Sequence, residues 1–281
     1  MEWIDSHSHL YADFQYSELD KIAELYESKV KIWLHAIEGT KRGNYRYPSA
    51  GNKDVLEVSR HYKGLFIPFA FVDLAGKPEQ IDRFADEGFA GLKFIYPPAD
   101  YDDPRFMPFY ERANALKMPC FFHTGIIARR RSCDFIVPGY KAAPRKMMPS
   151  MLDTIAAEFP DLKLVSGHMA VPWCNELFET LWFYRNVRCS VCGLADYKWL
   201  IEHLDNASED RTPYYKKMMF GTDLSYGRPM KEVGDWLANR VTFFRLFFDE
   251  VGNMYHWGDG KDDFMWKNAM EFLPEKDSGQ K

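Results

Sequence analysis

The sequence predicts an α/β protein folded as a closed barrel of eight β/α units, the (β/α)8 or TIM barrel. Three observations support this prediction. Short β-rich runs recur along the chain, an amphipathic helical pattern follows nearly every run, and the 281 residues contain eight such runs. Alternating strands and helices are typical of parallel βα units, and a barrel of eight units needs about 250 residues. An open, doubly wound sheet is the alternative architecture.

The predicted strands are short and rich in apolar and β-branched residues. They cover residues 3–9, 31–36, 65–72, 91–95, 119–123, 163–168, 187–192 and 218–223. Several are almost continuously apolar, as expected of strands that are packed on both faces. The segments between them carry apolar residues at helical spacing, for example Leu19, Ile22 and Ala23, and we expect these segments to form the outer layer.

Composition places limits on organisation and partners. No linker, repeat or shift in composition divides the chain, so we expect one domain over residues 1–281, with a frayed polar tail at 274–281. The net charge of -5 provides no general basic field, which argues against binding to nucleic acid or to an anionic membrane. No membrane span and no basic-then-apolar leader is visible.

The five cysteines are odd in number and scattered, which favours reduced thiols over a disulfide framework, so we expect a cytoplasmic location. Cys189 and Cys192 form a Cys-x-x-Cys pair within a predicted strand. A spacing of three along a strand points the two side chains to opposite faces. We therefore interpret the pair as packed and unreactive.

Two histidines stand close together near the start of the chain, in Asp5-Ser6-His7-Ser8-His9. Alternate residues of a strand share a face, so His7 and His9 point the same way, about 7 Å apart along the backbone. Two imidazoles there can converge on one ion. Taken alone the pair is a weak signal, since two packed or exposed histidines would give the same pattern.

Three further candidate ligands end later predicted strands. His123 ends the run 119–123, His168 ends the run 163–168, and Asp223 ends the run 218–223. Barrel enzymes place catalytic residues at the carboxyl ends of their strands, and parallel strands bring these ends to one rim. A single strand-end histidine is usually structural, whereas four histidines and one aspartate together indicate a metal centre.

With these residues the chain resembles the amidohydrolase superfamily, and in particular the branch that includes the aminocarboxymuconate-semialdehyde and γ-resorcylate decarboxylases. The resemblance extends over almost the whole chain. It rests on the segments 5–9, 88–93, 123–125, 159–163 and 167–168, 220–223 and 268–269. It implies a barrel of the metallo-dependent hydrolase type with a divalent metal cofactor.

The resemblance also implies a role for each strand-end residue. His7, His9, His123 and Asp223 ligate the metal, which is expected to be one Zn2+ ion rather than two. Nitrogen and carboxylate ligands with an open position suit catalytic zinc, which lowers the pKa of bound water from 15.7 to about 7. Asp223 is then the catalytic base, and His168 either polarises the substrate or protonates the leaving group.

Lys93 lies on the fourth predicted strand, at a barrel position where relatives with two metals carry a bridging carboxylated lysine. Three roles are open for it: this bridge, a direct contact with the substrate, or a side chain that points to the helix layer. We expect the contact with the substrate.

The segment 124–150 has no convincing periodicity and follows the fifth strand directly. Loops of that length are usually functional or disordered. It holds six basic residues and one acidic residue. Three of the basic residues are consecutive, Arg129, Arg130 and Arg131. Arginine binds carboxylate or phosphate through paired hydrogen bonds, so the segment favours a small anionic substrate. For each arginine, a solvated surface charge is the alternative.

Two aromatic residues stand just beyond the strand ends. Trp173 and Tyr226 are candidates for lining the substrate pocket, and packing beneath the loops is the alternative. A stripe of phenylalanines at helical spacing within residues 243–248 indicates core or a subunit contact, which leaves a homodimer open.

Two reactions fit this site. We expect hydrolysis of an amide, ester or lactone bond in a small carboxylated compound through metal-activated water. The alternative is metal-dependent, non-oxidative decarboxylation of a small aromatic or unsaturated acid, a carbon-carbon lyase reaction. Both use the same ligands, so the motif does not choose between them. A ligand-binding barrel without catalysis, or a metal-free lactonase, is a third hypothesis, against which the complete ligand set argues.

Overall fold

The computed structural model describes residues 2–25, 30–37, 49–126, 144–193, 200, 202–204, 206–207, 209–229 and 233–274. Within these residues nine parallel strands form one sheet in the order β8-β7-β6-β5-β4-β3-β2-β1-β9. They are β1 Trp3–Leu10, β2 Val30–His35, β3 Phe66–Phe71, β4 Gly91–Phe94, β5 Cys120–Phe122, β6 Leu164–Gly167, β7 Val187–Val191, β8 Met218–Phe220 and β9 Leu224–Tyr226. All eight predicted strands are confirmed, and their ends differ from the prediction by no more than three residues.

The sheet closes on itself along β1. β9 pairs with β1 in parallel, with Ser8 opposite Leu224. Just before β9, the amides of Thr222 and Asp223 donate hydrogen bonds to the carbonyl oxygen of His7 at 3.4 and 2.7 Å. β8 and β9 are therefore two pieces of one segment beside β1, interrupted at 221–223. The predicted (β/α)8 barrel is confirmed, and the open doubly wound sheet is excluded.

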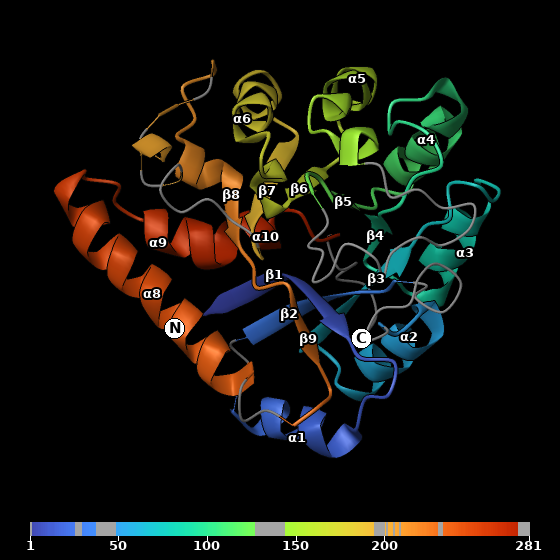
Figure 1. Ribbon diagram of the computed structural model, residues 1–281, viewed down its shortest axis with the longest axis horizontal. Helices are drawn as coiled ribbons and strands as arrows, with labels where there is room; N and C mark the ends of the chain where they lie inside the picture. Colours follow the sequence, from blue (N-terminus) through green and yellow to red (C-terminus); the bar gives the residue numbers. More distant parts are fainter. Residues whose placement is uncertain are drawn as a thin grey trace, which may run out of the picture.

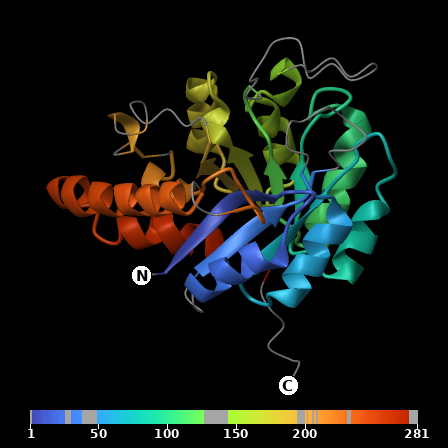
Figure 2. The ribbon, with the colours of Figure 1, turned by 60° about the horizontal axis from the view of Figure 1, so that its bottom comes forward.

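Helices surround the strands as an outer layer (Figures 1 and 2). In the described part of the chain, the α-helices are α1 Tyr16–Leu25, α2 Asn52–His61, α3 Gln80–Glu87, α4 Met107–Ala115, α5 Met151–Glu158, α6 Cys174–Phe183, α8 Val233–Met254, α9 Gly260–Asp262 and α10 Asn268–Met270. The short turns of helix are η1 Pro104–Phe106, η2 Pro144–Met147, η3 His168–Ala170, η4 Tyr214–Lys217 and η5 Asp263–Lys267. None of the described helices is long and apolar enough to cross a lipid bilayer.

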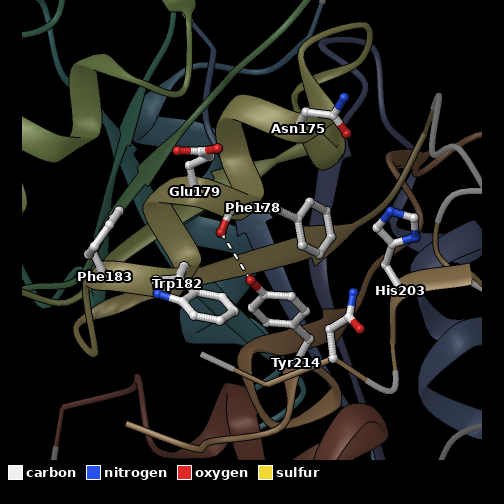
Figure 3. A pocket seen from close by; sticks show the side chains of 8 residues that line it. Asn175, Phe178, Glu179, Trp182, Phe183, His203 and Tyr214 are labelled. Carbon is white, nitrogen blue, oxygen red and sulfur yellow. Dashed lines mark hydrogen bonds between the residues drawn. The ribbon is translucent and has the colours of Figure 1, made fainter. Parts of the chain in front are cut away.

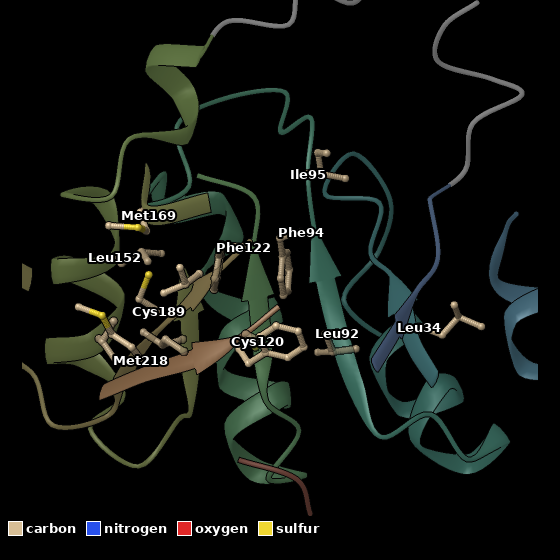
Figure 4. Packing of buried hydrophobic residues seen from close by; sticks show 14 of the residues in the cluster. Leu34, Leu92, Phe94, Ile95, Cys120, Phe122, Leu152, Met169, Cys189 and Met218 are labelled. Carbon is tan, nitrogen blue, oxygen red and sulfur yellow. The ribbon is translucent and has the colours of Figure 1, made fainter. Parts of the chain in front are cut away.

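Side chains alternate between the two faces of each strand, and this alternation separates two layers of core. Phe94 of β4 and Phe122 of β5 point outward toward the helices, and their rings stack with centroids 4.8 Å apart (Figure 4). The residues that precede them, Lys93 and Phe121, point into the barrel instead. The interior is thus available for a few large side chains and for the polar groups at its mouth.

The lower part of the barrel interior is a packed apolar cluster. Its buried members are Ile4, Trp33, Phe69, Phe121, Val165, Met219, Ala269 and Phe272. Ala269 and Phe272 come from the C-terminal segment, which closes the amino end of the barrel. Asn268 anchors this segment because its Nδ2 donates to the carbonyl oxygens of Tyr215 and Met218 at 2.9 and 2.7 Å. The polar mouth therefore rests on a dry, closed floor. The predicted frayed tail lies almost wholly outside the described residues.

Lys217 is the last residue of η4, and its buried side chain is hydrogen-bonded to the C-terminal end of α6. Its Nζ donates hydrogen bonds to the carbonyl oxygens of Leu181 at 2.6 Å and Tyr184 at 3.4 Å. These carbonyls end the helix, where a cation is favoured by the helix dipole. Burial nevertheless dominates and lowers the pKa of Lys217 from 10.5 to about 8.

This shifted pKa predicts how stability depends on pH. Between pH 8 and 10.5 the folded protein has released the Lys217 proton, whereas the unfolded chain still holds it. Stability rises with pH wherever the unfolded state binds more protons. We therefore expect the wild-type protein to gain unfolding free energy relative to Lys217→Met as the pH rises through this range. Denaturant titrations of both proteins at several pH values measure this difference, and a difference that stays constant contradicts the assignment.

Candidate metal centre

β1 carries the two histidines of the N-terminal motif to the mouth of the barrel. The register of β1 against β2 shifts between Asp5 and Ser8, where three steps along β1 match two along β2. Such a bulge re-aims side chains locally. The rings of His7 and His9 lie 4.9 Å apart, and both approach Asp223, so the prediction that they face the same way is confirmed.

Asp5 holds this segment in place from the outer side of β1. Its carboxylate accepts hydrogen bonds from the amide and hydroxyl of Thr222 and from the hydroxyl of Tyr226. Burial raises the pKa of Asp5 to about 7 in spite of these hydrogen bonds. The contacts tie β1 to the segment that carries Asp223.

Asp223 lies between the histidines. Its Oδ1 is 3.4 Å from His9 Nε2 and 3.7 Å from His7 Nδ1, and its Oδ2 is 3.9 Å from His168 Nδ1. The side chain is 34% exposed, so it faces the open mouth of the barrel. The structure therefore brings three of the predicted site residues, His7, His9 and His168, within 3.9 Å of the Asp223 carboxylate.

The backbone at two of these residues is strained. Asp223 has a φ of 63°, and His168 begins a run of three residues with positive φ, at 63°, 51° and 53°. Sparsely populated conformations of this kind cost of order 1–3 kcal/mol each and cluster at active sites, where the surrounding structure enforces them. The strain thus marks the loops after β6 and β8 as parts of the site.

His123 sits at the edge of this group. Its ring centroid is 4.5 Å from that of His168, and its Nε2 is 3.3 Å from the carbonyl oxygen of Ile126. It belongs to neither of the two groups of donor atoms that converge within 4.8 Å among the described residues, which are His7, His9 and Asp223, and His7, His168 and Cys192. Its role as a ligand stays a prediction.

Cys192 and His35 are site residues to which the sequence assigned no role. Cys192 Sγ is 2.9 Å from His7 Nδ1 and 3.7 Å from His168 Nδ1. The ring of His35 lies 5.0 Å from that of His7, and its Nε2 is 3.1 Å from the carbonyl oxygen of Ser6. His35 is the last residue of β2, and Cys192 ends the predicted strand 187–192, but no local pattern in the sequence distinguishes these two residues from packed ones.

Lys93 points into the barrel and not to the helix layer. It is fully buried, with Nζ 2.9 Å from His7 Nε2 and 4.1 Å from the centre of the Phe121 ring. Burial lowers its pKa to about 7. The side chain therefore lies directly beneath the histidines, within reach of any group bound there.

Burial also keeps four of the imidazoles, those of His7, His35, His123 and His168, neutral. Burial is the largest cause that lowers the pKa of His7, His35 and His123 well below 6.5, and it lowers that of His168 to about 4. Asp223 behaves differently, because nearby His168, His9 and Lys93 outweigh the opposing effect of burial and lower its pKa. Neutral imidazoles and an ionised carboxylate are the forms that ligate a cation.

These donors fit a divalent cation. Two nitrogen or oxygen ligands of a tetrahedral ion, each bound at about 2.0–2.2 Å, lie about 3.3–3.6 Å apart. The 3.4 Å separation between His9 Nε2 and Asp223 Oδ1 lies in this range, and the 3.7 Å separation to His7 Nδ1 is close to it. The donor atoms of His7, His9 and Asp223, which all lie within 4.8 Å of one another, are therefore near the spacing that one ion requires.

The predicted substrate residues fall in different places. Arg129, Arg130 and Arg131 lie outside the described residues. Trp173 is partly buried at the residue before α6. Tyr226 is fully buried with its hydroxyl on Asp5, which fits the packing alternative better than a place in the pocket.

A separate pocket of about 550 Å³ lies between α6 and the segment that leads into η4 (Figure 3). The hydroxyl of Tyr214 donates to the carbonyl oxygen of Phe178 across its floor at 3.2 Å. The lining residues are Asn175, Phe178, Glu179, Trp182, Phe183, His203, Asn206 and Tyr214. None of them is a predicted site residue.

Gly193 leaves no room for a side chain beside the centre. A Cβ there would lie 2.8 Å from both Asp223 Oδ2 and His168 Nδ1, and the residue has a φ of +58°. Displacing groups that orient metal ligands typically weakens metal binding by 10- to 100-fold. We expect Gly193→Ala to raise the metal dissociation constant by about this factor, measured by competition with a chelator.

Gly64→Ala is the matched control for this substitution. Gly64 has a φ of +87°, but nothing lies within 4 Å of its Cβ position. Both variants carry the cost of a left-handed alanine, about 1–2 kcal/mol. Only Gly193→Ala should lose metal affinity, and equal affinities in the two variants would refute the steric argument.

A closed parallel barrel whose strand ends gather imidazoles and a carboxylate belongs to the class of barrel enzymes with a polar centre at the carboxyl face. The family model described as amidohydrolase matches residues 4–279. The chain therefore belongs to the amidohydrolase family, and the superfamily resemblance in the sequence is confirmed.

The similar solved structures include a probable hydrolase and a decarboxylase. The chain is similar to a probable 2-pyrone-4,6-dicarboxylic acid hydrolase from Acinetobacter baumannii, with 13% identity, TM-score 0.60, and coverage of 97% of this chain and 99% of that one. It is also similar to 2,6-dihydroxybenzoate decarboxylase from Rhizobium, with 14% identity, TM-score 0.61, and coverage of 97% and 98%. At these identities the likeness concerns the fold.

A third similar structure was determined with a metal. It is 5-carboxyvanillate decarboxylase from Novosphingobium aromaticivorans complexed with manganese, with 16% identity, TM-score 0.58, and coverage of 90% of this chain and 79% of that one. No match is found among proteins of curated function.

Proposed function

We propose that this protein is a metal-dependent hydrolase that cleaves an amide, ester or lactone bond in a small carboxylated compound. The observation that carries the proposal is the convergence of His7, His9 and Asp223, whose donor atoms lie within 4.8 Å of one another at the carboxyl ends of the strands. Family membership and the manganese in a similar structure support a divalent cation at this position.

His7, His9, His123 and Asp223 are the proposed ligands, and we propose one ion, zinc. When bound, the cation acts as a Lewis acid and makes a coordinated water acidic near neutral pH. Asp223 stays ionised at neutral pH because its pKa is lowered, so it can accept a proton from water held at the mouth.

His168 orients the substrate in this proposal. With its pKa lowered to about 4, it is neutral at pH 7 and donates an N–H hydrogen bond to a substrate oxygen instead of a full proton. Its Nδ1 is 3.9 Å from Asp223 Oδ2, so the two groups can act on neighbouring atoms of one substrate.

The substrate is proposed to be anionic. The segment with Arg129, Arg130 and Arg131 follows β5 directly, so it begins at the rim that holds the centre. Lys93 lies beneath the histidines, and with a pKa of about 7 it can carry a positive charge near a bound carboxylate.

Non-oxidative decarboxylation is the second candidate. It uses the same proposed ligands, and two of the similar structures are decarboxylases of aromatic acids. The reaction differs because it needs a proton delivered to carbon and releases carbon dioxide.

One screen tests both candidates. The metal-loaded protein is incubated with small aromatic acids, lactones and acylated acids, and the products are followed by mass spectrometry. Titratable acid from a lactone or ester supports hydrolysis, and carbon dioxide from an aromatic acid supports the alternative. His9→Ala should abolish either activity and bound metal, whereas His61→Ala, a change of a histidine in α2, should leave both intact. A wild-type protein that never binds stoichiometric metal would overturn the proposal.

A further inference from the structure

Cys192 is a buried side chain that the proposed reaction does not use. It follows the last residue of β7 and is fully buried at the mouth of the barrel. Its Sγ approaches two imidazole nitrogens, His7 Nδ1 at 2.9 Å and His168 Nδ1 at 3.7 Å. A buried free cysteine usually behaves as a small apolar side chain, whereas this one faces metal-ligating groups.

The alternation of β7 explains why only one cysteine of the pair reaches the centre. Cys189 and Val191 belong to the outer core between the strands and the helices, where Cys189 packs near Met218 (Figure 4). Ser190 and Cys192 point the other way, and the hydroxyl of Ser190 is 2.7 Å from that of Ser6 in β1. The expectation that the pair occupies opposite faces is confirmed, but Cys192 does not lie in an apolar environment.

We infer that Cys192 is a thiolate ligand of the metal ion in this centre, and that the centre consequently prefers a thiophilic ion such as zinc over manganese or magnesium. The inference rests on the proposed metal-dependent function. On binding, the thiol loses its proton to solvent and the sulfur forms a bond to the ion, so one proton is released for each ion bound.

Cys192 Sγ lies close enough to His7 Nδ1 to share an ion with it. A sulfur bound at about 2.3 Å and a nitrogen bound at about 2.0–2.1 Å lie about 3.6 Å apart on a tetrahedral ion. Cys192 Sγ lies 2.9 Å from His7 Nδ1, the neighbouring proposed ligand, so these two atoms must move apart from hydrogen-bonding distance when an ion binds between them. Cys192 Sγ lies 3.7 Å from His168 Nδ1. The three donors His7, His168 and Cys192 lie within 4.8 Å of one another, and all three are buried.

The ligand set also determines which ion is preferred. Imidazole and carboxylate ligands alone accept manganese as well as zinc, whereas a thiolate selects zinc and other soft ions. In the alternative arrangement the thiol only donates a hydrogen bond to His7 Nδ1 and positions that ring. The two arrangements differ in whether a metal–sulfur bond exists, which spectroscopy detects directly.

Cobalt substitution of the full-length protein tests the inference without an activity assay. We expect the cobalt-loaded wild type to show a thiolate-to-cobalt charge-transfer band in the near ultraviolet. Cys192→Ser should lose the band, and Cys189→Ser, the same change three residues earlier within β7, should keep it. In competition with a chelator, Cys192→Ser should bind zinc at least about 10-fold more weakly, with a smaller loss for manganese.

The possible failures are distinguishable. Cobalt uptake without a charge-transfer band, or a band that survives Cys192→Ser, overturns the thiolate ligand and leaves the metal-dependent function standing. A protein that takes up no cobalt, zinc or manganese overturns both.

Discussion

Replacing Asp223 with asparagine is expected to lower kcat by about 10²- to 10⁴-fold, the usual contribution of a group that transfers a proton in the transition state. Asp223 has its Oδ1 near His9 and His7 and its Oδ2 near His168. Asparagine keeps the shape of the side chain but removes its charge and its capacity to accept a proton. Bound metal should fall as well, because an anionic ligand becomes neutral.

Folding should be largely unaffected by this change. Asp223 has a φ of 63°, and asparagine is among the residues that tolerate this left-handed conformation. The measurements are metal content, turnover of the substrate found by the screen, and thermal unfolding. Asp13→Asn is the control, because Asp13 forms an exposed ion pair with Arg228 that contributes little. Full activity in Asp223→Asn would exclude the residue from the chemistry.

Replacing Phe121 with alanine is expected to destabilise the protein by about 3–5 kcal/mol. Phe121 is fully buried in the cluster inside the barrel. Its ring lies 4.6 Å from that of His7 and 4.4 Å from that of His35, so it supports the centre from below. Gly167 is packed against this ring, since a Cβ there would lie 2.8 Å from it. A closed barrel cannot easily collapse around the resulting cavity.

Chemical denaturation measures this loss. Phe183→Ala is the matched control, because Phe183 is 61% exposed, and surface substitutions usually change stability by less than about 0.5 kcal/mol. The metal affinity of Phe121→Ala should also fall, since His7 and Lys93 lose the ring against which they pack. A loss no larger than that of Phe183→Ala would show that the interior is not a rigid support for the centre.

The apolar packing inside the barrel also affects the chemistry at its mouth, because it removes the site histidines from water. The same burial that stabilises the barrel lowers the pKa values of His7, His123 and His168, so these rings keep a free lone pair at neutral pH. A cation entering this site meets neutral nitrogens and one ionised carboxylate and does not have to displace protons from imidazolium groups. Metal uptake by the imidazoles should therefore persist to mildly acidic pH.

The positions of the strands and of most candidate ligands followed from the sequence because they depend on local periodicity. Strand alternation was sufficient to pair His7 with His9, and the rule that parallel strands end at one rim was sufficient to bring His168 and Asp223 to them. These inferences need only a strand and its direction, which a run of apolar residues followed by a polar residue reveals.

Three features were decided by the tertiary structure alone. The interruption that divides β8 from β9 arises from barrel closure against β1, where Thr222 and Asp223 donate to the backbone of His7. Cys192 and His35 reach the centre because of the tilt of their strands and the register of those strands against their neighbours. No local pattern in the sequence distinguishes these two residues from packed ones. His123 lies partly apart from the other donors, and this position depends on the loop after β5, where its Nε2 contacts the carbonyl oxygen of Ile126. Chain direction is a local property, whereas the distance between two side chains on different strands depends on every turn and contact between them.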